Sequence, residues 1–215
     1  YWFIDLSFFY QIMKKLLGIL VLGLLLSGNA EADKSINDWS GLYLGVYQSE
    51  DNLSASATST RYPDQPYSIS TDENIYNTGY FVGYNYSINN LIVGIEAGEQ
   101  DNVGKDKAIT GSNGYIVYDD MQEYKLKIGY SLDKYLVYTF FGTGDLNVYW
   151  SAYAQEVKDK NNFEIKGIGL SAKITNNIFV GLSYSETNLD IYYQDTLYDE
   201  VVQLDSLRLR FGYLF

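Results

Sequence analysis

The side chains best suited to chemistry in this sequence are isolated charged residues within runs of apolar and small residues. They are Glu96, Lys125, Lys127, Asp145, Lys173, Arg208 and Arg210. Arg208 and Arg210 are two positions apart, and so are Lys125 and Lys127. This spacing places both members of each pair on one face of a β-strand. Buried unpaired charges are costly, so we expect Glu96 and Asp145 each to contact at least one of the bases. The chemistry that this pattern predicts is ion pairing.

Catalytic chemistry has little support in the sequence. The chain contains no His and no Cys. A general base with a pKa near neutrality would therefore have to be a perturbed carboxylate or Lys, and no paired-carboxylate or Ser-Lys spacing stands out. The lack of Cys also excludes disulfides and thiolate metal sites. We predict no catalytic residue and no cofactor.

Acidic clusters are the only candidates for metal ligands. Asp119 and Asp120 form one cluster, and Asp195, Asp199 and Glu200 form another, both near expected loop tips. Carboxylate oxygens can hold Ca²⁺, but the alternating Asp pattern of a calcium loop is missing. A solvated acidic face is the simpler interpretation, so we predict no metal site.

Composition narrows the class of protein further. The chain has 15 Lys and Arg against 27 Asp and Glu, a net charge of −12, which argues against nucleic acid as a partner. Tyr is abundant at 23 of 215 residues, with 10 Phe and only 2 Pro. Aromatic enrichment without a helical period favours β-strands.

Eight alternating runs fit this expectation of an all-β chain. We expect strands at 39–49, 75–87, 91–103, 115–131, 135–150, 163–174, 178–192 and 203–215. Each is long enough for the ~9–11 tilted residues with which a β-strand crosses an outer membrane. Short polar turns at 88–90, 132–134 and 175–177 alternate with longer polar connections at 50–74, 104–114, 151–162 and 194–202. Short turns at one end and long loops at the other are typical of a transmembrane barrel.

The two faces of these runs differ in an unusual way. In the run 124–131, Tyr124, Leu126 and Ile128 oppose Lys125 and Lys127. The runs 91–103, 163–174, 178–192 and 203–215 likewise oppose an apolar row to mostly small or charged residues, whereas a soluble barrel would bury the bulky apolar row. We therefore expect lipid outside and a salt-bridged, largely plugged interior, in which Gly residues leave room for long charged side chains. Tyr and Trp near both strand ends fit interfacial girdles.

The last strand carries a second signal. Leu207, Leu209, Phe211, Tyr213 and Phe215 share one face, opposite Arg208 and Arg210. A strand that ends on an aromatic residue after alternating aromatics resembles the C-terminal signal by which the barrel-assembly machinery recognises outer-membrane proteins. We expect this strand to pair with 39–49 and close the barrel.

The N-terminal region predicts export. Lys14 and Lys15 precede an apolar run at 16–26, which is shorter than the ~20 residues of a transmembrane helix. Ala30 and Ala32 then form a small-x-small cleavage site. We interpret 13–32 as a signal peptide, 1–12 as upstream sequence outside the native protein, and 33–215 as the barrel domain.

Three motifs resemble a known family. Residues 39–45 read W-S-G-L-Y-L-G, 79–86 read G-Y-F-V-G-Y-N-Y, and 91–96 read L-I-V-G-I-E. In this order they resemble the first three strands of the small outer-membrane β-barrel superfamily, which includes bacterial surface antigens and opacity-type proteins. The resemblance implies an eight-stranded antiparallel up-and-down transmembrane β-barrel in the outer membrane of a Gram-negative bacterium, embedded in its lipids.

Three functions stay open on the sequence. The first is a role in envelope integrity or in surface recognition of an adhesin-like kind, with an extracellular ligand that the sequence does not name. The second is a narrow porin-like channel, and the third is a soluble periplasmic ligand-binding barrel. The expected lipid-facing rows disfavour the third.

Overall fold

The computed structural model describes residues 36–59, 68–101, 104–106, 115–152, 155–193 and 198–215. The segments 1–12 and 13–32, with the cleavage-site residues Ala30 and Ala32, lie outside the described residues. Within the described ranges there is no helix long and apolar enough to cross a membrane.

The described chain is a single antiparallel sheet. Its strands are β1 (Gly41–Ser59), β2 (Ser68–Ile88), β3 (Leu91–Gln100), β4 (Gly104–Asp106), β5 (Tyr115–Leu132), β6 (Tyr135–Ala152), β7 (Gln155–Lys173), β8 (Ile178–Tyr193) and β9 (Tyr198–Leu214). The short β4 pairs with β5 beyond the end of β3, so β3 and β4 occupy one position in the wall. The barrel therefore has eight strand positions, as predicted.

Closure joins the two ends of the sheet. Strand β1 pairs with β9 from Tyr43 opposite Leu214 to Ser59 opposite Tyr198. The backbone N–H of Phe215 also donates to the carbonyl oxygen of Leu42 over 2.8 Å. The predicted closing of the barrel by its last strand is thus confirmed.

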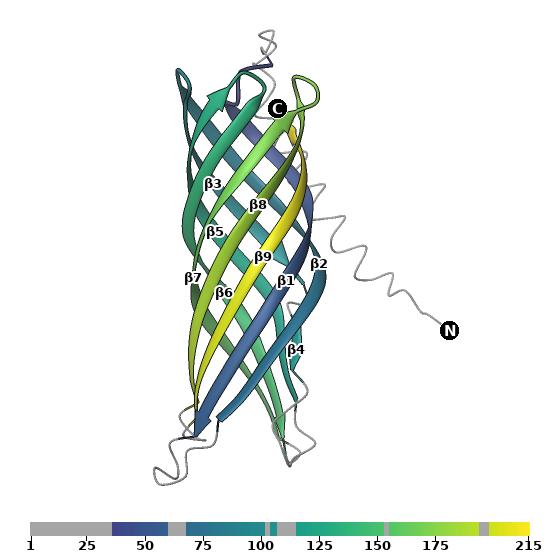
Figure 1. Cartoon of the computed structure of the whole chain (residues 1–215), viewed down its shortest axis with the longest axis vertical. Coiled ribbons are helices and arrows are strands. Elements are labelled where there is room, and N and C mark those ends of the chain that lie inside the picture. The colour runs from purple at the N-terminus through teal and green to yellow at the C-terminus, as the bar shows by residue number, and fades with distance from the viewer. Residues whose placement is uncertain (1–35, 60–67, 102–103, 107–114, 153–154, 194–197) are drawn as a thin grey trace, which may run out of the picture.

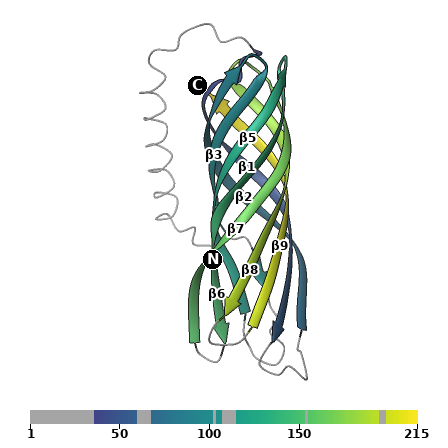
Figure 2. The same cartoon turned by 90° about the vertical axis from the view of Figure 1, so that its left-hand side faces the viewer.

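The barrel is narrow and tall, with tilted strands and three tight turns at the end beside the C-terminus (Figures 1 and 2). Asn89 and Asp133 sit in these turns with φ angles of 55° and 52°. Asn and Asp tolerate this left-handed region better than most residues. In the third turn, the Thr175 hydroxyl instead accepts hydrogen bonds from the backbone N–H groups of Asn177 and Ile178.

The strands are much longer than predicted at the other end. The region 50–74, expected to be a loop, contains paired strand up to Thr58 opposite Ser68. The regions 151–162 and 194–202 are likewise mostly strand. Our loop predictions were wrong there because these stretches are rich in polar residues, and their few inward apolar residues, such as Leu53 and Val202, do not form the sustained alternation that marks a half-buried strand.

An apolar belt surrounds the end with the tight turns. Its outward side chains are exposed, as in Tyr124, Leu126, Ile128 and Leu209. Beyond Tyr124 on β5 the next outward residue is Gln122, and corresponding positions on the other strands are mostly polar. With about seven to nine residues per strand at ~3.3 Å each and a tilt near 40°, the belt is ~18–23 Å tall, close to the ~25 Å apolar band of outer-membrane barrels.

Candidate functional site

Inward-facing charges gather at mid-height in the barrel. Glu96 comes from β3, Lys125 and Lys127 from β5, and Arg208 and Arg210 from β9. All five are at least 93% buried, because the strand period that exposes the apolar belt turns them into the lumen. We call these residues, together with Glu123 described below, the charge layer.

Glu96 is one of two centres of the charge layer. Arg210 donates from Nη2 to its Oε2 over 2.5 Å, and the Tyr43 hydroxyl donates to the same oxygen over 2.9 Å. Lys125 lies 3.4 Å from Oε1. The Lys127 ammonium is 4.0 Å away and donates to the Tyr43 hydroxyl over 2.8 Å. A carboxylate with this many donors is well stabilised despite its burial.

Glu123 is the second centre, and the sequence analysis missed it. Arg208 donates from Nη1 to both of its carboxylate oxygens, at 2.6 and 2.9 Å, and Lys125 forms a close ion pair with Oε1. Glu123 is two positions before Lys125, so the same spacing that singled out the lysines could have placed it on their face.

A third buried acid lies on β1. Asp51 is fully buried, and its Oδ2 accepts hydrogen bonds from Ser49, Asn77 and Gln100, at 2.9, 2.7 and 2.8 Å. It lies in a stretch that we had expected to be a loop, which is why it was not predicted.

Asp145 differs from the expectation. Its side chain lies on the outer face of β6 and is partly exposed. It pairs over 2.8 Å with Lys160, an exposed residue of the neighbouring strand β7. The inward positions around it are Gly144 and Leu146. The assignment of Asp145 to the lumen was wrong, because the inward residues of β6 are the even-numbered ones.

Lys173 is inward but separate from the charge layer. Its ammonium donates to the backbone oxygen of Asp38 and lies 5.2 Å from the centre of the Trp39 ring, at the end with the tight turns. Neither Glu96 nor Glu123 pairs with it in the ion pairs described above.

The acidic clusters considered for metal binding also differ from the prediction where the structure describes them. Asp119 and Asp120 are not at a loop tip but at a bulge of β5, where Asn147 donates to Asp120 over 3.2 Å. Asp195 lies outside the described residues, and Asp199 and Glu200 belong to β9. Among the residues described, no group of three or more potential ligands is placed to hold a metal ion.

Aromatic rings fill more of the lumen than predicted. Arg210 lies 4.1 Å from the centre of the Phe81 ring, Lys127 lies 4.3 Å from that of Tyr43, and Arg208 lies 4.6 Å from that of Tyr47. Cations gain from such contacts when they are desolvated. The charge layer is therefore held between rings as well as between ion pairs.

The inward glycines mainly accommodate these rings rather than charged side chains. A Cβ at Gly83 would collide with Tyr43, one at Gly169 with Tyr138, and one at Gly212 with Phe179. Gly94 and Gly98, beside Lys127 and Glu123, are the cases closer to our expectation. Most of the glycines of the wall thus leave room for an aromatic ring of the adjacent strand.

On the side of the charge layer that lies away from the tight turns, the lumen is mostly apolar. Buried side chains there come from β1 and from β5 to β9: Leu53, Tyr118, Met121, Leu146, Val148, Phe163, Ile165, Leu189, Val202 and Leu204. The interior is therefore closed by charge, rings and aliphatic side chains together, and not by charge alone.

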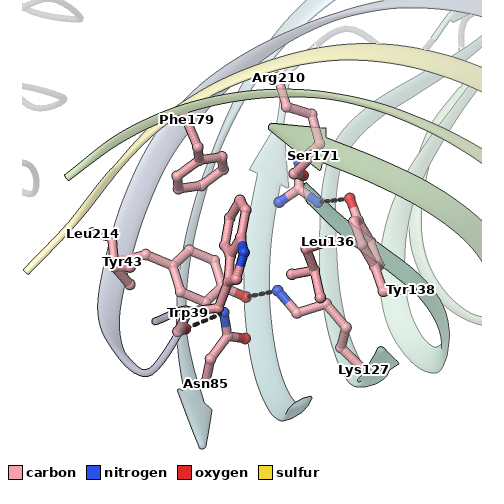
Figure 3. Close-up of a pocket in the computed structure, with 10 residues that line it drawn as sticks. All are labelled: Trp39, Tyr43, Asn85, Lys127, Leu136, Tyr138, Ser171, Phe179, Arg210 and Leu214. Atoms are coloured by element: carbon pink, nitrogen blue, oxygen red, sulfur yellow. Dashed lines mark hydrogen bonds between the residues drawn. The ribbon is translucent and has the colours of Figure 1, made fainter. Parts of the chain in front are cut away.

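One cavity beside the charge layer is very small. A cavity of about 10 Å³ lies between Trp39, Asn85, Lys127, Phe179 and Arg210, and Figure 3 shows these side chains converging on it. That volume corresponds to about one water molecule. The indole N–H of Trp39 and the Oδ1 of Asn85, one donor and one acceptor, have no protein partner. This arrangement can hold a water molecule but offers no passage.

Comparison with known proteins gives the fold. No protein-family model and no curated protein matches the chain. Among solved structures, the OmpT protease of Escherichia coli has a TM-score of 0.53 at 9% identity, with 84% of this chain and 100% of that one aligned. OprG of Pseudomonas aeruginosa has a TM-score of 0.51 at 9% identity, covering 84% and 99%.

The attachment invasion locus protein Ail of Yersinia pestis is 15% identical, with a TM-score of 0.47 and coverage of 82% and 99%. At such identities the likeness shows fold and not activity. The neighbours include a protease, so the fold alone does not separate an enzyme from a non-enzyme. The closed antiparallel wall and the outer apolar belt agree with the folds of OmpT and OprG, and the chain has the fold of an eight-stranded outer-membrane β-barrel.

Proposed function

We propose that this protein is a closed outer-membrane barrel whose protruding outer half serves surface recognition. The observation that carries the proposal is the length of the strands beyond the belt. Strand β7 continues from Gly167 to Gln155 and β1 from Gln48 to Ser59 after the apolar rows have ended. At ~3.3 Å per residue and a tilt near 40°, about ten residues of wall project ~25 Å from the membrane.

The shape of this protruding wall supports a binding role. Pairing between β7 and β8 ends at Glu164 opposite Asn188, while β7 stays paired with β6 out to Gln155, and β8 with β9 out to Tyr193. Among the described residues, 155–163 and 189–193 therefore face each other without a ladder. Unpaired strand edges can bind an extended polypeptide through its backbone.

The interior supports a closed barrel rather than a channel. An eight-stranded barrel is just wide enough for side chains to fill. Here the charge layer is followed by a buried apolar core, and both would have to move before a solute could pass. We place the narrow porin-like channel second for this reason.

An enzymatic role finds no support in the chain itself. The sequence has no His, and the buried carboxylates Glu96 and Glu123 are occupied by Arg and Lys donors. A role in envelope integrity is compatible with the same geometry, because a packed barrel embedded in outer-membrane lipids adds a rigid element to the membrane.

Export and assembly complete the proposal. The segment 13–32 would direct the chain across the inner membrane, with cleavage at Ala30 and Ala32. The barrel-assembly machinery would then recognise the outward row of β9. That row is Leu207, Leu209, Phe211, Tyr213 and Phe215.

Two measurements test the function. Single-channel recording with the refolded barrel should show no stable conductance, and a large, reproducible conductance would establish the channel instead. Adherence of bacteria displaying the protein to cultured cells should fall when the β1–β2 hairpin is shortened to a tight turn at the Asn52–Asn74 pair. Asn89→Gly, at the opposite end of the barrel, is the control. Unchanged adherence of correctly inserted shortened barrels would refute recognition by this hairpin.

A further inference from the structure

Unpartnered polar atoms gather on one side of the lumen, between the charge layer and the apolar core. They are Asp51 Oδ1, Ser185 Oγ, Thr187 Oγ1, Ser206 Oγ, Arg208 Nε and Arg208 Nη2. All five residues are at least 95% buried. Buried polar atoms without a partner are rare and destabilising, so six of them together indicate that something is bound there.

The register shows that the five residues form one patch. Asp51 on β1 lies opposite Ser206 on β9, and Ser206 lies opposite Ser185 on β8. Arg208 and Thr187 are each two positions away along their own strands, on the same inward face. The side chain on β9 between Asp51 and Arg208 is thus the small hydroxyl of Ser206.

The hydrogen-bonding state of the two charged residues defines what fits. Asp51 is held by three donors on Oδ2, which leaves Oδ1 as an acceptor without a donor. Arg208 uses Nη1 for Glu123, which leaves the N–H groups on the Nε and Nη2 edge without an acceptor. The occupant must accept hydrogen bonds from Arg208 and donate one to Asp51.

We propose that this patch, the Asp51–Arg208 site, binds a small cluster of water molecules that bridges the Asp51 carboxylate to the Arg208 guanidinium. Water both accepts and donates, and the three hydroxyls can take either role. An anion would satisfy Arg208 but would be repelled by Asp51, and a metal cation would be repelled by Arg208. A larger solute cannot reach residues so completely enclosed.

The bridge has a structural consequence. Asp51, Asn77 and Gln100 otherwise form a cluster of their own on β1, β2 and β3. Bridging water would connect that cluster through Arg208 to Glu123 and Lys125, so that polar contacts would run without a break across the lumen. The side of the charge layer that faces the apolar core would then be lined by water.

A high-resolution crystal structure of the refolded mature chain tests the site. We expect ordered water within hydrogen-bond distance of both Asp51 Oδ1 and the Arg208 Nε–Nη2 edge. Direct contact between the two side chains, or an empty site in a map that shows other buried waters, would overturn the proposal. Crystals soaked in bromide provide a second readout, because anomalous density in the site would identify an anion instead.

A variant pair tests the site in solution. Ser206→Ala keeps the space for water, whereas Ser206→Val fills it with two methyl groups. We expect Ser206→Val to displace water from the crystal structure and to lower the urea midpoint of unfolding more than Ser206→Ala does. Equal midpoints for the two variants, or a higher midpoint for Ser206→Val, would mean that the space is dry.

Discussion

Glu123 is the residue whose replacement should most damage the barrel. The carboxylate is 1% exposed, receives two hydrogen bonds from Arg208 and pairs with Lys125. Glu123→Gln keeps the shape of the side chain but removes its charge. Lys125 retains Glu96 at 3.4 Å, whereas Arg208 loses the acid to which both of its described ion-pair hydrogen bonds are made.

The expected loss in unfolding free energy is about 3–5 kcal/mol, the usual effect of leaving a buried charge without its partner. Urea titration of the refolded barrel in detergent micelles, with the folded fraction read from the heat-dependent gel shift, measures it. Glu186→Gln is the matched control, because Glu186 pairs with Lys166 over 3.1 Å on the outer wall, where both side chains are exposed. That change should cost at most about 1 kcal/mol.

A double variant separates charge from shape. Glu123→Gln combined with Arg208→Met removes both members of the pair, so it should recover part of the stability lost in Glu123→Gln alone. If Glu123→Gln costs no more than Glu186→Gln, the charge layer is freely hydrated and the reasoning about a closed interior is wrong.

Three further changes test the wall and its assembly. Leu209→Arg places a charge on the lipid-facing belt and should lower the unfolding free energy in lipid vesicles by about 2–4 kcal/mol. Gln203→Arg, beyond the belt, should have little effect. Equal losses for the two variants would refute the position of the belt. Gly169→Ala should lower the unfolding free energy by about 1–3 kcal/mol in the same titration, because the added Cβ collides with the ring of Tyr138. The loss should be smaller in a Tyr138→Leu background. If it is not, the ring is not the cause. Phe215→Ala should slow insertion into the outer membrane, measured as the yield of heat-modifiable barrel in membrane fractions, and an unchanged yield would dismiss the terminal aromatic as an assembly signal.

The sequence by itself determined which faces of most strands meet lipid and lumen. A strand has a period of two, so the alternation in 124–131 and 207–213 was sufficient to assign lipid and lumen, and Asn89 and Asp133 were sufficient to mark two turns. The same logic placed Glu96, Lys125, Lys127, Arg208 and Arg210 inside. These features are local, and local patterns can be read along the chain.

Only the tertiary structure decided which charges meet. Glu96 and Arg210 are 114 residues apart in sequence, and Glu123 and Arg208 are 85 apart, so their contacts depend on the stagger of strands around the closed wall. The same stagger left Lys173 near Asp38 and away from Glu96. The lengths of the strands beyond the belt were also decided there. That part of the wall is polar outside and has only scattered apolar residues inside, so cross-strand hydrogen bonds rather than a side-chain pattern define its length.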